Sequence, residues 1–509
     1  MRRQTNRWAF LSGLLAVGVA VLVGELIAAW LSPSISPVTA VGGSVIDALP
    51  PGVKDWAISL FGTADKTVFI SVMALAIGIL AGLAGVLESR RRYWGVVGIA
   101  AFGVLGAVSV LSRAQGSVVA AAAPVVVAVL GIILLRAFID RLVAWQSQPE
   151  ASNGVQRRVF LRTLSFGAAG AVIAGLVTGV VRGSLASYQA ARDKLRLPTP
   201  SQAAAPIPAG AQLELAGLEP LVTPNEGFYR IDTALSVPVI NPDNWQLKVT
   251  GMVDREVTIS MAELLSQPMI EQYVTIACVS NEVGGNLIGN ARWLGWPVRE
   301  LLAKAGVKAG ADMVLSRSQD GFTASTPLEA LTDDRGSIIA VGMNSELLPL
   351  EHGFPARMIV PGLYGYVSAT KWITELKVTT FAADLAYWST RGWSDHGPIK
   401  QSSRIDTPRS GASVTSGELA IGGSAWAQTK GISAVEVQVD YGGWQRAELA
   451  AGISADTWVQ WKASVALPPG QHTVQVRSTD AAGNLQSAQI APPAPDGSSG
   501  YHSIRVSAK

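Results

Sequence analysis

The chain of 509 residues contains a single cysteine, Cys278, in surroundings that indicate chemistry. Cys278 follows the strand-like run YVTIA and enters the polar, glycine-rich stretch VSNEVGGNLIGNARW. Where a strand ends in such a loop, backbone amides can approach a ligand closely. A thiolate there could be a soft ligand of a transition metal, or a nucleophile if His352 or His396 acts as its base. The remaining interpretation is a buried thiol that packs as a small apolar side chain.

The sequence excludes several other kinds of cysteine and histidine chemistry. One cysteine permits no intrachain disulfide and no zinc-finger spacing. None of the four histidines lies within residues 1–182, so a bis-histidine haem between membrane helices is excluded, as is a Cys-x-x-Cys-His haem attachment. The run GGNLIG lacks the strand and helix that a dinucleotide fingerprint needs. We expect His472 and His502, in the C-terminal β-rich part, to have structural roles.

Composition indicates that part of the chain lies in a membrane. Apolar residues make up 49% of the chain and charged residues 15%, and the length predicts several domains. A net charge of +3 is too small to indicate nucleic-acid binding. Residues 1–182 contain segments long enough to cross a hydrocarbon layer of about 30 Å. The five predicted spans are Trp8–Leu31, Thr67–Leu87, Trp94–Leu111, Val118–Ile139 and Thr163–Val181.

The arginines of this half predict its orientation. They concentrate before the first span, between the second and third spans, and between the fourth and fifth. The positive-inside rule therefore predicts a cytoplasmic N-terminus, and five spans place everything after Val181 outside the cytoplasm. We expect Val45–Phe61 to be a loop or interfacial helix, with part of a sixth span as the alternative. Glu25 is an ionisable residue near the outer end of a span, where we expect an interfacial position. We interpret the bundle as an anchor that docks an electron-transfer partner.

The fifth span begins with a motif of its own. Arg157-Arg158 followed by Phe160-Leu161 resembles a twin-arginine export signal, placed inside the chain rather than at its start. Such signals export folded, cofactor-loaded domains, so this interpretation predicts that the outer domain receives its cofactor in the cytoplasm. The alternative is that the two arginines only anchor the span under the positive-inside rule.

The rest of the chain divides into a linker and two domains. Residues 183–212 are rich in alanine and proline and predict a semi-extended tether. Residues 213–407 combine strand-like runs such as WQLKVTGMV, MVLSRS and SIIAVGM with the helical MAELLSQ and PVRELLAKAG, which predicts an α+β domain. Residues 408–509 contain short alternating strands with turn signals, typical of an immunoglobulin-like β-sandwich.

Several motifs resemble one family in the right order. TIACVSNEVGG…IGNARWLGWPVRELL and MNSELLPLEHGFPARMIVPGLYG…TKW resemble the molybdenum-binding core of the sulfite oxidase family. GFYRID resembles its short arginine-containing stretch on the pterin, and the tail ending DGSSGYHSIRV resembles its immunoglobulin-like dimerisation domain. The resemblance runs from about Pro220 to the C-terminus. With the residues before it, it implies a multi-domain protein: a five-helix transmembrane bundle, an α+β molybdopterin domain and an immunoglobulin-like β-sandwich.

The resemblance implies roles for individual residues. Cys278 would be the thiolate ligand of molybdenum, and Asn281 would lie in the loop that lines the molybdopterin. His352 and Arg357, in HGFPAR, match residues that hold the pterin and its phosphate. Lys371, in KW, matches a further contact.

Two more matched residues precede Cys278 in the chain. Tyr229 and Arg230, in GFYRID, match the family stretch whose arginine faces the pterin and the substrate anion. A guanidinium offers such an anion a bidentate fork of donors.

The sequence also departs from the family. True sulfite oxidases carry two arginines in the loop after the ligand cysteine, whereas Glu282 and Val283 hold those places here. This puts a doubly negative substrate in doubt, unless Arg292 supplies the charge. A family tyrosine near the metal has no clear counterpart. The later stretch YWSTRGWSDHGPIK offers candidate pocket residues, with a surface loop as the alternative: Tyr387, Arg391, Trp393, His396 and Lys400. Of these, we take His396 as a candidate catalytic residue.

Together these features predict a membrane-anchored, extracytoplasmic molybdenum oxidoreductase that transfers an oxygen atom to or from a small substrate. Sulfite oxidation is the leading reaction, and reduction of an S- or N-oxide is the alternative within the family. Electrons would pass to an external cytochrome or quinone-linked partner, since we expect no haem in this chain. The resemblance implies a homodimer through the C-terminal domain. From other classes, a thiol hydrolase and a non-catalytic binding module on a membrane anchor remain open.

Overall fold

A computed structural model describes residues 2–31, 36–49, 60, 65–112, 118–147, 153–182, 185–234 and 237–509. The chain forms two compact units. The first comprises Met1–Gln189 with Ala234–Pro238, and the second comprises Ala190–Thr233 with Val239–Lys509. The helices of the first unit are α1 (Arg2–Leu31), α2 (Pro37–Ala48), α4 (Asp65–Arg90), α5 (Trp94–Leu111), α6 (Val118–Gln146) and α7 (Asn153–Arg182).

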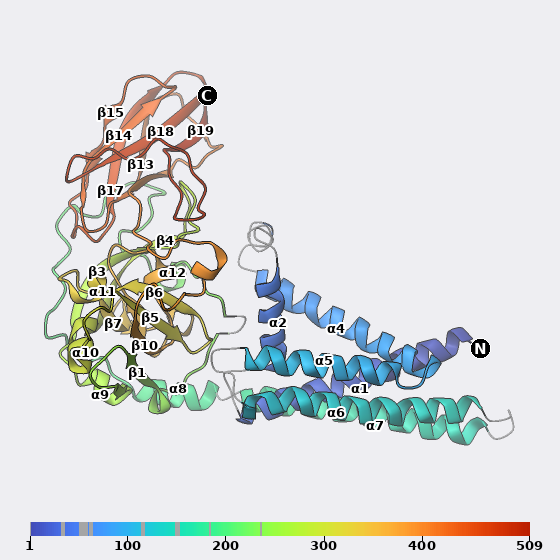
Figure 1. Cartoon of the computed structure of the whole chain (residues 1–509). Helices are drawn as coiled ribbons and strands as arrows, with labels where there is room; N and C mark the ends of the chain where they lie inside the picture. Colours follow the sequence, from blue (N-terminus) through green and yellow to red (C-terminus); the bar gives the residue numbers. More distant parts are fainter. Residues whose placement is uncertain are drawn as a thin grey trace. The chain divides into compact units, whose positions relative to one another are not determined.

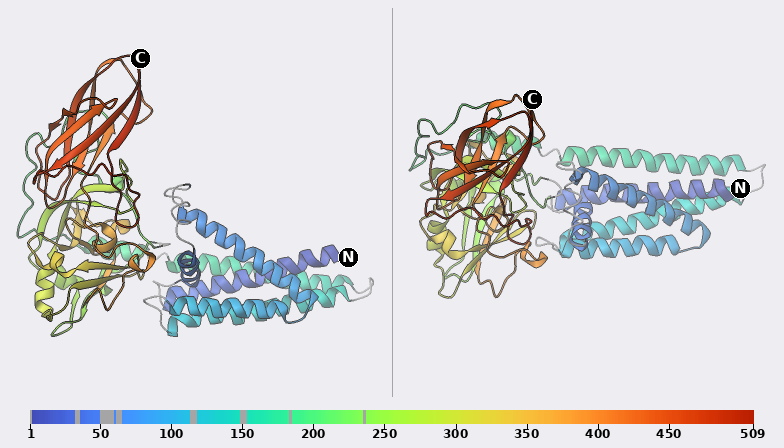
Figure 2. Two further views of the ribbon diagram at one scale, coloured as in Figure 1. Left: turned by 45° about the horizontal axis from the view of Figure 1, so that its top comes forward. Right: turned by 90° about the horizontal axis from the view of Figure 1, so that it is seen from above.

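The first unit is a bundle of long apolar helices that run side by side (Figure 1, Figure 2). Helix α1 packs against α4, α6 and α7, and α5 packs against α4 and α6. Within the described ranges, four helices are long and apolar enough to cross a membrane: Thr5–Ile27, Val68–Arg90, Trp94–Leu111 and Ala120–Gln146. These coincide with the first four predicted spans. The fifth predicted span lies within α7, which is not one of the four, so its crossing stays a prediction.

Two buried carboxylates of the bundle cap neighbouring helices. Glu25 Oε1 accepts hydrogen bonds from Ser36 Oγ at 2.7 Å and from the Val38 amide at 3.0 Å, at the start of α2. Glu88 Oε2 accepts from the Gly95 amide at 3.0 Å, at the start of α5. Amides at helix N-termini lack partners within the helix, so these carboxylates satisfy them. Glu25 therefore has a structural role in the described part of the bundle. Most of the predicted Val45–Phe61 loop lies outside the described residues, and its first residues form the end of α2.

The predicted tether differs from the structure. Helix α8 (Leu185–Lys194) occupies its first part, because LASYQAARDK is rich in good helix formers. The following extended segment packs on the second unit, where the Ser201 amide donates to Met269 O at 2.8 Å and Ala211 is fully buried. Residues 195–212 are therefore part of the folded unit rather than a free spacer.

The middle of the second unit contains two sheets and several short helices (Figure 1). One sheet has the order β2-β1-β10-β5-β6, and the other has the order β3-β4-β7-β8, with β9 paired to β7. Strands of the first are β1 (Gln246–Gly251), β2 (Val257–Ser260), β5 (Met313–Ser318), β6 (Thr323–Pro327) and β10 (Ile373–Thr379). Strands of the second are β3 (Ile270–Ala277), β4 (Ile288–Pro297), β7 (Ile338–Met343), β8 (Glu346–Leu347) and β9 (Arg357–Ile359).

The helices of this region begin and end at local signals. In α9 (Met261–Leu265), Ser260 and Glu263 form a reciprocal capping box. Helix α10 (Val298–Ala305) ends at Gly306, which has φ +72°. Both helices and the strand-like runs quoted above were predicted from the sequence, and the structure confirms them. The remaining short helices are α11 (Leu328–Thr332), α12 (Gly365–Ser368) and the 3-10 turns η3 (Asn225–Gly227), η4 (Pro242–Asn244), η5 (Leu350–His352) and η6 (Ser389–Arg391).

The C-terminal part of the second unit is a two-sheet β-sandwich. Its sheets have the orders β11-β13-β17-β16 and β12-β19-β18-β14-β15, and Ile421, Val437 and Trp461 are fully buried in the shared core. This confirms the all-β prediction, while the immunoglobulin type stays a prediction. The strands are β11 (Ser402–Thr407), β12 (Ser413–Val414), β13 (Gly417–Trp426), β14 (Ile432–Val439), β15 (Gln445–Arg446), β16 (Glu448–Leu449), β17 (Val459–Leu467), β18 (Gly470–Asp480) and β19 (His502–Ala508).

Candidate active site

Cys278 lies at the C-terminal end of β3, at the first position of a tight loop that returns into β4. Its amide donates to Leu287 O at 2.9 Å, and its own carbonyl accepts from the Asn281 amide at 3.0 Å. The Asn281 side chain closes the loop, because its Oδ1 accepts from the Leu287 amide at 2.8 Å. Cys278 is 9% exposed and Asn281 is 8% exposed. The sequence prediction that Cys278 sits where a strand meets a loop is therefore confirmed.

The C-terminal β-sandwich supports this loop from its other side. Ser498 Oγ donates to Asn281 O at 2.7 Å, and Arg404 Nη1 donates to Gly285 O at 2.9 Å. The His502 ring lies against Gly284, which has φ +80°, so that a β-carbon there would fall 2.1 Å from His502 Cδ2. His502 Nδ1 accepts from the Ile405 amide at 3.0 Å, and burial lowers its pKa to about 4. A neutral imidazole therefore packs beneath the loop.

The aromatic segment before β1 contributes Phe228 and Tyr229. Phe228 is buried and contacts the His352 ring edge-to-face, with ring centroids 5.6 Å apart. Burial raises the pKa of the Tyr229 phenol, the Cys278 thiolate raises it further, and the Arg357 guanidinium lowers it. Burial and the Cys278 charge outweigh the Arg357 charge, so the phenol stays protonated at neutral pH.

His352 is held in the neutral form. It is 5% exposed, and its Nε2 lies 3.1 Å from Asn225 O. A carbonyl oxygen only accepts, so Nε2 carries the proton and Nδ1 is left as an acceptor. Burial lowers the pKa of His352 to about 4, and the positive charges of Arg357 and Lys371 lower it in the same direction.

Arg357 is a buried cation whose donors are only partly used. Its side chain donates to His352 O at 3.1 Å and to Ala369 O at 3.2 Å, while Nε is buried without a hydrogen-bond partner among the described residues. No described carboxylate pairs with it. Burial lowers its pKa to about 10, so the guanidinium is still charged at neutral pH. A buried charge without a counter-ion is costly, which favours an anion bound at this position.

Lys371 and Arg230 share one buried carboxylate. Asp232 Oδ2 lies 2.8 Å from Lys371 Nζ and 3.1 Å from Arg230 Nε. Lys371 also donates to Glu351 O at 3.0 Å, and burial lowers its pKa to about 8. Two cations against one carboxylate leave a net positive charge beside His352. Arg230 is the most exposed of the three, with 38% of its side chain accessible, so it can meet a ligand arriving from solvent.

The structure brings together seven of the predicted site residues and leaves His396 elsewhere. Cys278 and Asn281 share one loop, Arg357 donates to His352 O, and Arg230 and Lys371 share Asp232. Tyr229 interacts electrostatically with Cys278 and Arg357. His396 lies on the surface with 57% of its side chain exposed. Its ring stacks on Phe381 at 4.2 Å, and Nδ1 contacts Asp395 Oδ1 at 2.7 Å. These described contacts make the surface-loop alternative the better interpretation of His396.

The other positive candidates near the site are engaged elsewhere. Arg292 lies on β4 with Nε 3.3 Å from Glu271 Oε1, and it also donates to Ser345 Oγ. Arg391 lies over the Tyr387 ring at 3.6 Å. Lys400 Nζ pairs with Asp496 Oδ1 at 2.9 Å. Arg292, the candidate for the charge that Glu282 and Val283 lack, is thus paired with a carboxylate.

Sequence reasoning missed Asp232 and Tyr364. Asp232 organises two cations, and the signal for it was its place two residues after Arg230 in GFYRID. Tyr364 is buried, and its pKa is raised to about 12 by burial, with a further contribution from the Cys278 charge. It lines a small cavity with Asn281, Glu282 and Lys400. Tyr364 therefore supplies a tyrosine close to Cys278, which the sequence pattern alone did not identify.

Comparison with known proteins identifies the family of this chain. The family model described as "Oxidoreductase molybdopterin binding domain" matches residues 234–388. Mitochondrial sulfite oxidase of Macaca fascicularis is 29% identical over 325 residues, which are 54% of this chain and 59% of that protein. The human enzyme is 28% identical over the same length, so the match spans under two thirds of these relatives.

A bacterial relative is covered more fully. The uncharacterized oxidoreductase YuiH of Bacillus subtilis (strain 168) is 32% identical over 161 residues, which are 32% of this chain and 78% of that protein. Among solved structures, the sulfane dehydrogenase SoxCD of Paracoccus pantotrophus has a TM-score of 0.47 at 23% identity, covering 52% of this chain and 75% of that one. On the sequence matches and the site built around Cys278, this chain is an enzyme of the sulfite oxidase family of molybdopterin-dependent oxidoreductases.

Proposed function

We propose that the second unit binds a molybdenum–molybdopterin cofactor, with Cys278 as the thiolate ligand of the metal, and transfers an oxygen atom to or from a small substrate. The observation that carries this proposal is the buried Arg357, whose Nε has no partner in the described chain and whose charge has no described carboxylate. The pterin phosphate is an anion that would use this donor. Arg357 and Cys278 both interact electrostatically with the Tyr229 phenol.

The remaining residues fit the same group. Lys371, and Arg230 beside it, would meet further anionic or carbonyl oxygens, while His352 Nδ1 is available as an acceptor because Nε2 donates to Asn225 O at 3.1 Å. When bound, the cofactor supplies the two-electron redox centre, while the protein orients and insulates it. Tyr229 and Tyr364 stay protonated at neutral pH and can donate hydrogen bonds to a substrate oxygen.

Sulfite oxidation is the leading reaction. The support is the similarity to enzymes named sulfite oxidase and the accessible guanidinium of Arg230, which would attract an oxyanion. Reduction of an S- or N-oxide is the second candidate, because Glu282 lines the cavity beside Asn281 and Arg292 is paired with Glu271. A carboxylate at that place repels a doubly negative substrate and tolerates a neutral oxide.

Metal content and turnover test the proposal together. We expect about one molybdenum atom per chain by elemental mass spectrometry of the detergent-purified protein, from a host that makes the cofactor. Cys278→Ser should abolish turnover with sulfite and with sulfoxides while the protein stays folded and membrane-inserted. Wild-type turnover in that variant would refute the ligand role. A molybdenum-free wild type would instead favour the binding-module alternative, and rapid alkylation of Cys278 without metal would favour a thiol hydrolase.

The first unit is proposed as a multi-pass anchor in the bacterial cytoplasmic membrane. Four apolar helices support a membrane location, and the arginine pattern supports a cytoplasmic N-terminus. With α7 as a fifth crossing, the second unit lies outside the cytoplasm. There it would pass electrons to an external cytochrome or quinone-linked partner, and a homodimer through the β-sandwich is part of the same proposal.

Cysteine labelling tests this topology. In a Cys278→Ser background, Ala209→Cys should react with a membrane-impermeant maleimide in intact cells, because residue 209 is exposed in the second unit. Ser147→Cys, exposed after α6, should react only after the cells are broken. The opposite pattern would reverse the orientation, and labelling of both positions in intact cells would contradict an odd number of crossings between them.

A further inference from the structure

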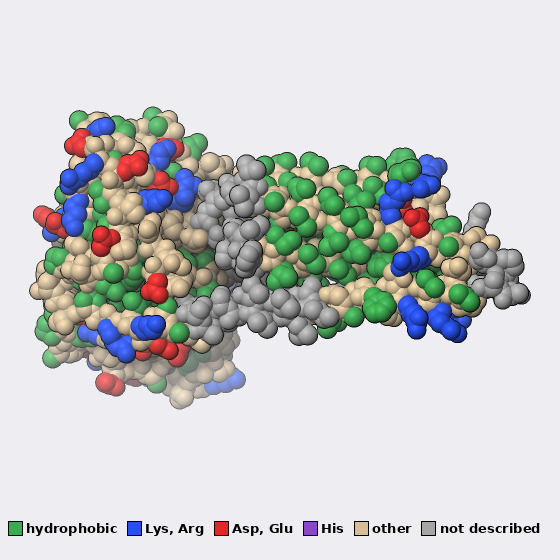
Figure 3. Space-filling model, turned by 90° about the horizontal axis from the view of Figure 1, so that it is seen from below, with side chains coloured by type: hydrophobic (Ala, Val, Ile, Leu, Met, Phe, Trp, Pro, Cys, Tyr) green, Lys and Arg blue, Asp and Glu red, His purple; other side chains and the backbone are tan. Residues whose placement is uncertain are grey.

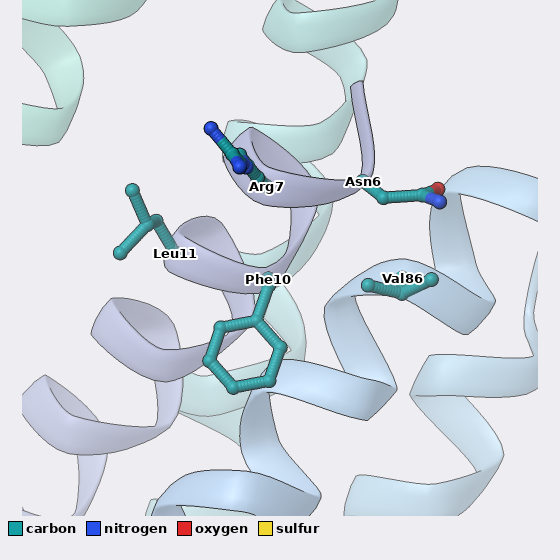
Figure 4. A pocket seen from close by; sticks show the side chains of 5 residues that line it. All are labelled: Asn6, Arg7, Phe10, Leu11 and Val86. Atoms are coloured by element: carbon teal, nitrogen blue, oxygen red, sulfur yellow. The ribbon is translucent and has the colours of Figure 1, made fainter. Parts of the chain in front are cut away.

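A groove between α1 and α4 is not explained by the oxidoreductase site. It is lined by Asn6, Arg7, Phe10, Leu11 and Val86 (Figure 4). Arg7 and Leu11 lie one helical turn apart and extend from the same side of α1, while Asn6 extends toward Val86 on α4 (Figure 4). One end of the groove is therefore polar and positively charged, and the rest is apolar.

The groove exists because the two helices approach very closely beside it. A β-carbon at Gly85 would fall 2.1 Å from Ala9 O and 2.8 Å from Gly13 N, so the two backbones touch at these glycines. The ring of Phe10 lies on Gly82, where a β-carbon would come within 2.2 Å of it. Small residues at such a crossing let the two helices pack closely against each other beside the groove.

Arg7 is the charged side chain of the groove lining. Arg7 is exposed, and no described residue forms a hydrogen bond or ion pair with it. None of the five lining residues is acidic. Seen from below, a face of the bundle other than the one that carries α4 also has lysine and arginine side chains gathered toward one end (Figure 3). The groove end thus attracts an anion.

The flank beside the groove suits a hydrocarbon chain. Leu11 is 43% exposed and Leu14 is 39% exposed on α1, and Leu83 and Leu87 are 46% and 47% exposed on α4. Exposed leucines in this number are ordinary for a surface in contact with lipid. A ligand that combines a phosphate group for Arg7 with an acyl chain for these leucines is an anionic phospholipid.

We propose that this groove is a binding site for an anionic phospholipid, whose phosphate group lies at Arg7 and Asn6 and whose acyl chain lies along Phe10, Leu11 and Val86. Basic pockets between membrane helices bind anionic head groups in this manner. The inference rests on the proposed membrane location, and the labelling experiment above tests that location separately.

Native mass spectrometry of the full-length, delipidated protein in detergent tests the site. We expect one dioleoylphosphatidylglycerol to bind at concentrations where dioleoylphosphatidylcholine does not. Arg7→Gln should weaken phosphatidylglycerol binding about fivefold, the effect of one basic residue at an anionic surface. Arg162→Gln is the matched control, because Arg162 is an exposed arginine outside the groove, and it should change binding less than twofold. Arg7→Lys should retain the preference.

A second variant tests the apolar part without altering charge. Leu11→Trp fills the groove and should weaken binding although Arg7 remains. Equal binding of the two lipids, equal effects of Arg7→Gln and Arg162→Gln, or unchanged binding in Leu11→Trp would each overturn the proposal. A dimer in the native mass spectrum that phosphatidylglycerol does not dissociate, together with no lipid binding, would also overturn the proposal. The groove would then be an interface between two copies of the chain.

Discussion

The His502 ring lies against the α-carbon of Gly284, in the loop that begins at Cys278, with no room between them for a methyl group. The same loop accepts hydrogen bonds from Ser498 and Arg404. Residues of the C-terminal β-sandwich therefore shape the loop that presents the thiol. Removal of this support should alter the site before it alters the rest of the fold.

Gly284→Ala should displace the Cys278 loop. The added methyl group meets His502 at 2.1 Å, and the backbone has φ +80°. We expect a loss of about 1–3 kcal/mol in stability, together with at least a tenfold loss of turnover and reduced molybdenum content. Gly411→Ala is the control, because Gly411 has φ +85° with nothing within 4 Å. Equal loss of turnover in both variants would show that the contact with His502 does not matter.

Arg357→Gln should reduce retention of the cofactor by at least tenfold. The buried guanidinium is the strongest unpaired positive group in the described site, and Gln cannot replace its charge or its fork of donors. Arg317→Gln serves as the control, since Arg317 already pairs with Glu375 at 3.0 Å. Pterin fluorescence after release and molybdenum content measure retention. Full occupancy in Arg357→Gln would contradict an anion at this position.

The stability of the second unit should fall as the pH drops from about 6.5 to about 4. Burial lowers the pKa of His352 to about 4 from its ordinary 6.5, so the unfolded state binds more protons in that window. The contribution of His352 to the free energy of unfolding is fully present above pH 6.5. It decreases by about 3 kcal/mol as the pH falls from 6.5 to below 4. When thermal unfolding is followed by tryptophan fluorescence, the melting temperature should depend less steeply on pH in His352→Gln than in the wild type. An identical slope in both proteins would mean that His352 titrates normally.

Asp232→Asn should cause the cofactor to be lost at a lower alkaline pH than in the wild type. Burial lowers the pKa of Lys371 to about 8, and the Asp232 charge opposes that fall. We expect retention by the wild type to decrease above pH 8, as Lys371 loses its charge, and the decrease to begin at lower pH in Asp232→Asn. Molybdenum content after dialysis at each pH provides the measurement. A pH profile unchanged by the substitution would remove Lys371 from the cofactor site.

Replacement of Arg157-Arg158 with Lys-Lys should leave the second unit in the cytoplasm, if the pair is an export signal. The positive charge at the start of α7 is kept, so simple anchoring would be unaffected. The accessibility of Ala209→Cys in intact cells reports the outcome. Normal labelling would leave the two arginines as ordinary topology signals.

The sequence predicted local structure where the pattern was contiguous. Cys278 at the end of a strand and the helices α9 and α10 followed from such motifs, whereas the roles of His352 and Arg357 came from the family resemblance. The catalytic role of His396 stays a prediction, although the structure places it on the surface; a histidine in a polar loop has the same sequence signal whether it faces a site or solvent. Its position depends on the stacking with Phe381, which is a tertiary contact.

Strand β4 and Tyr364 are features that the sequence did not predict because they depend on tertiary contacts. The run GNARW reads as a polar loop, yet Asn290 is fully buried in β4 because its side chain donates to Leu221 O and accepts from Thr275 Oγ1. The Leu221 carbonyl that accepts from Asn290 is 69 positions away in the chain, so the pattern of neighbouring residues cannot reveal it. Tyr364 likewise approaches Cys278 only through the packing of distant segments.

The hydrogen bond from Ser498 to Asn281 joins residues 217 positions apart. During synthesis the loop at Cys278 must therefore wait for its last supports until the ribosome has added all of the intervening chain. Contacts of such long sequence separation form late and slowly. A polypeptide interrupted between residues 388 and 498 would carry the whole segment that matches the molybdopterin-binding family model and would still lack the hydrogen bond from Ser498 that supports the loop at its thiol.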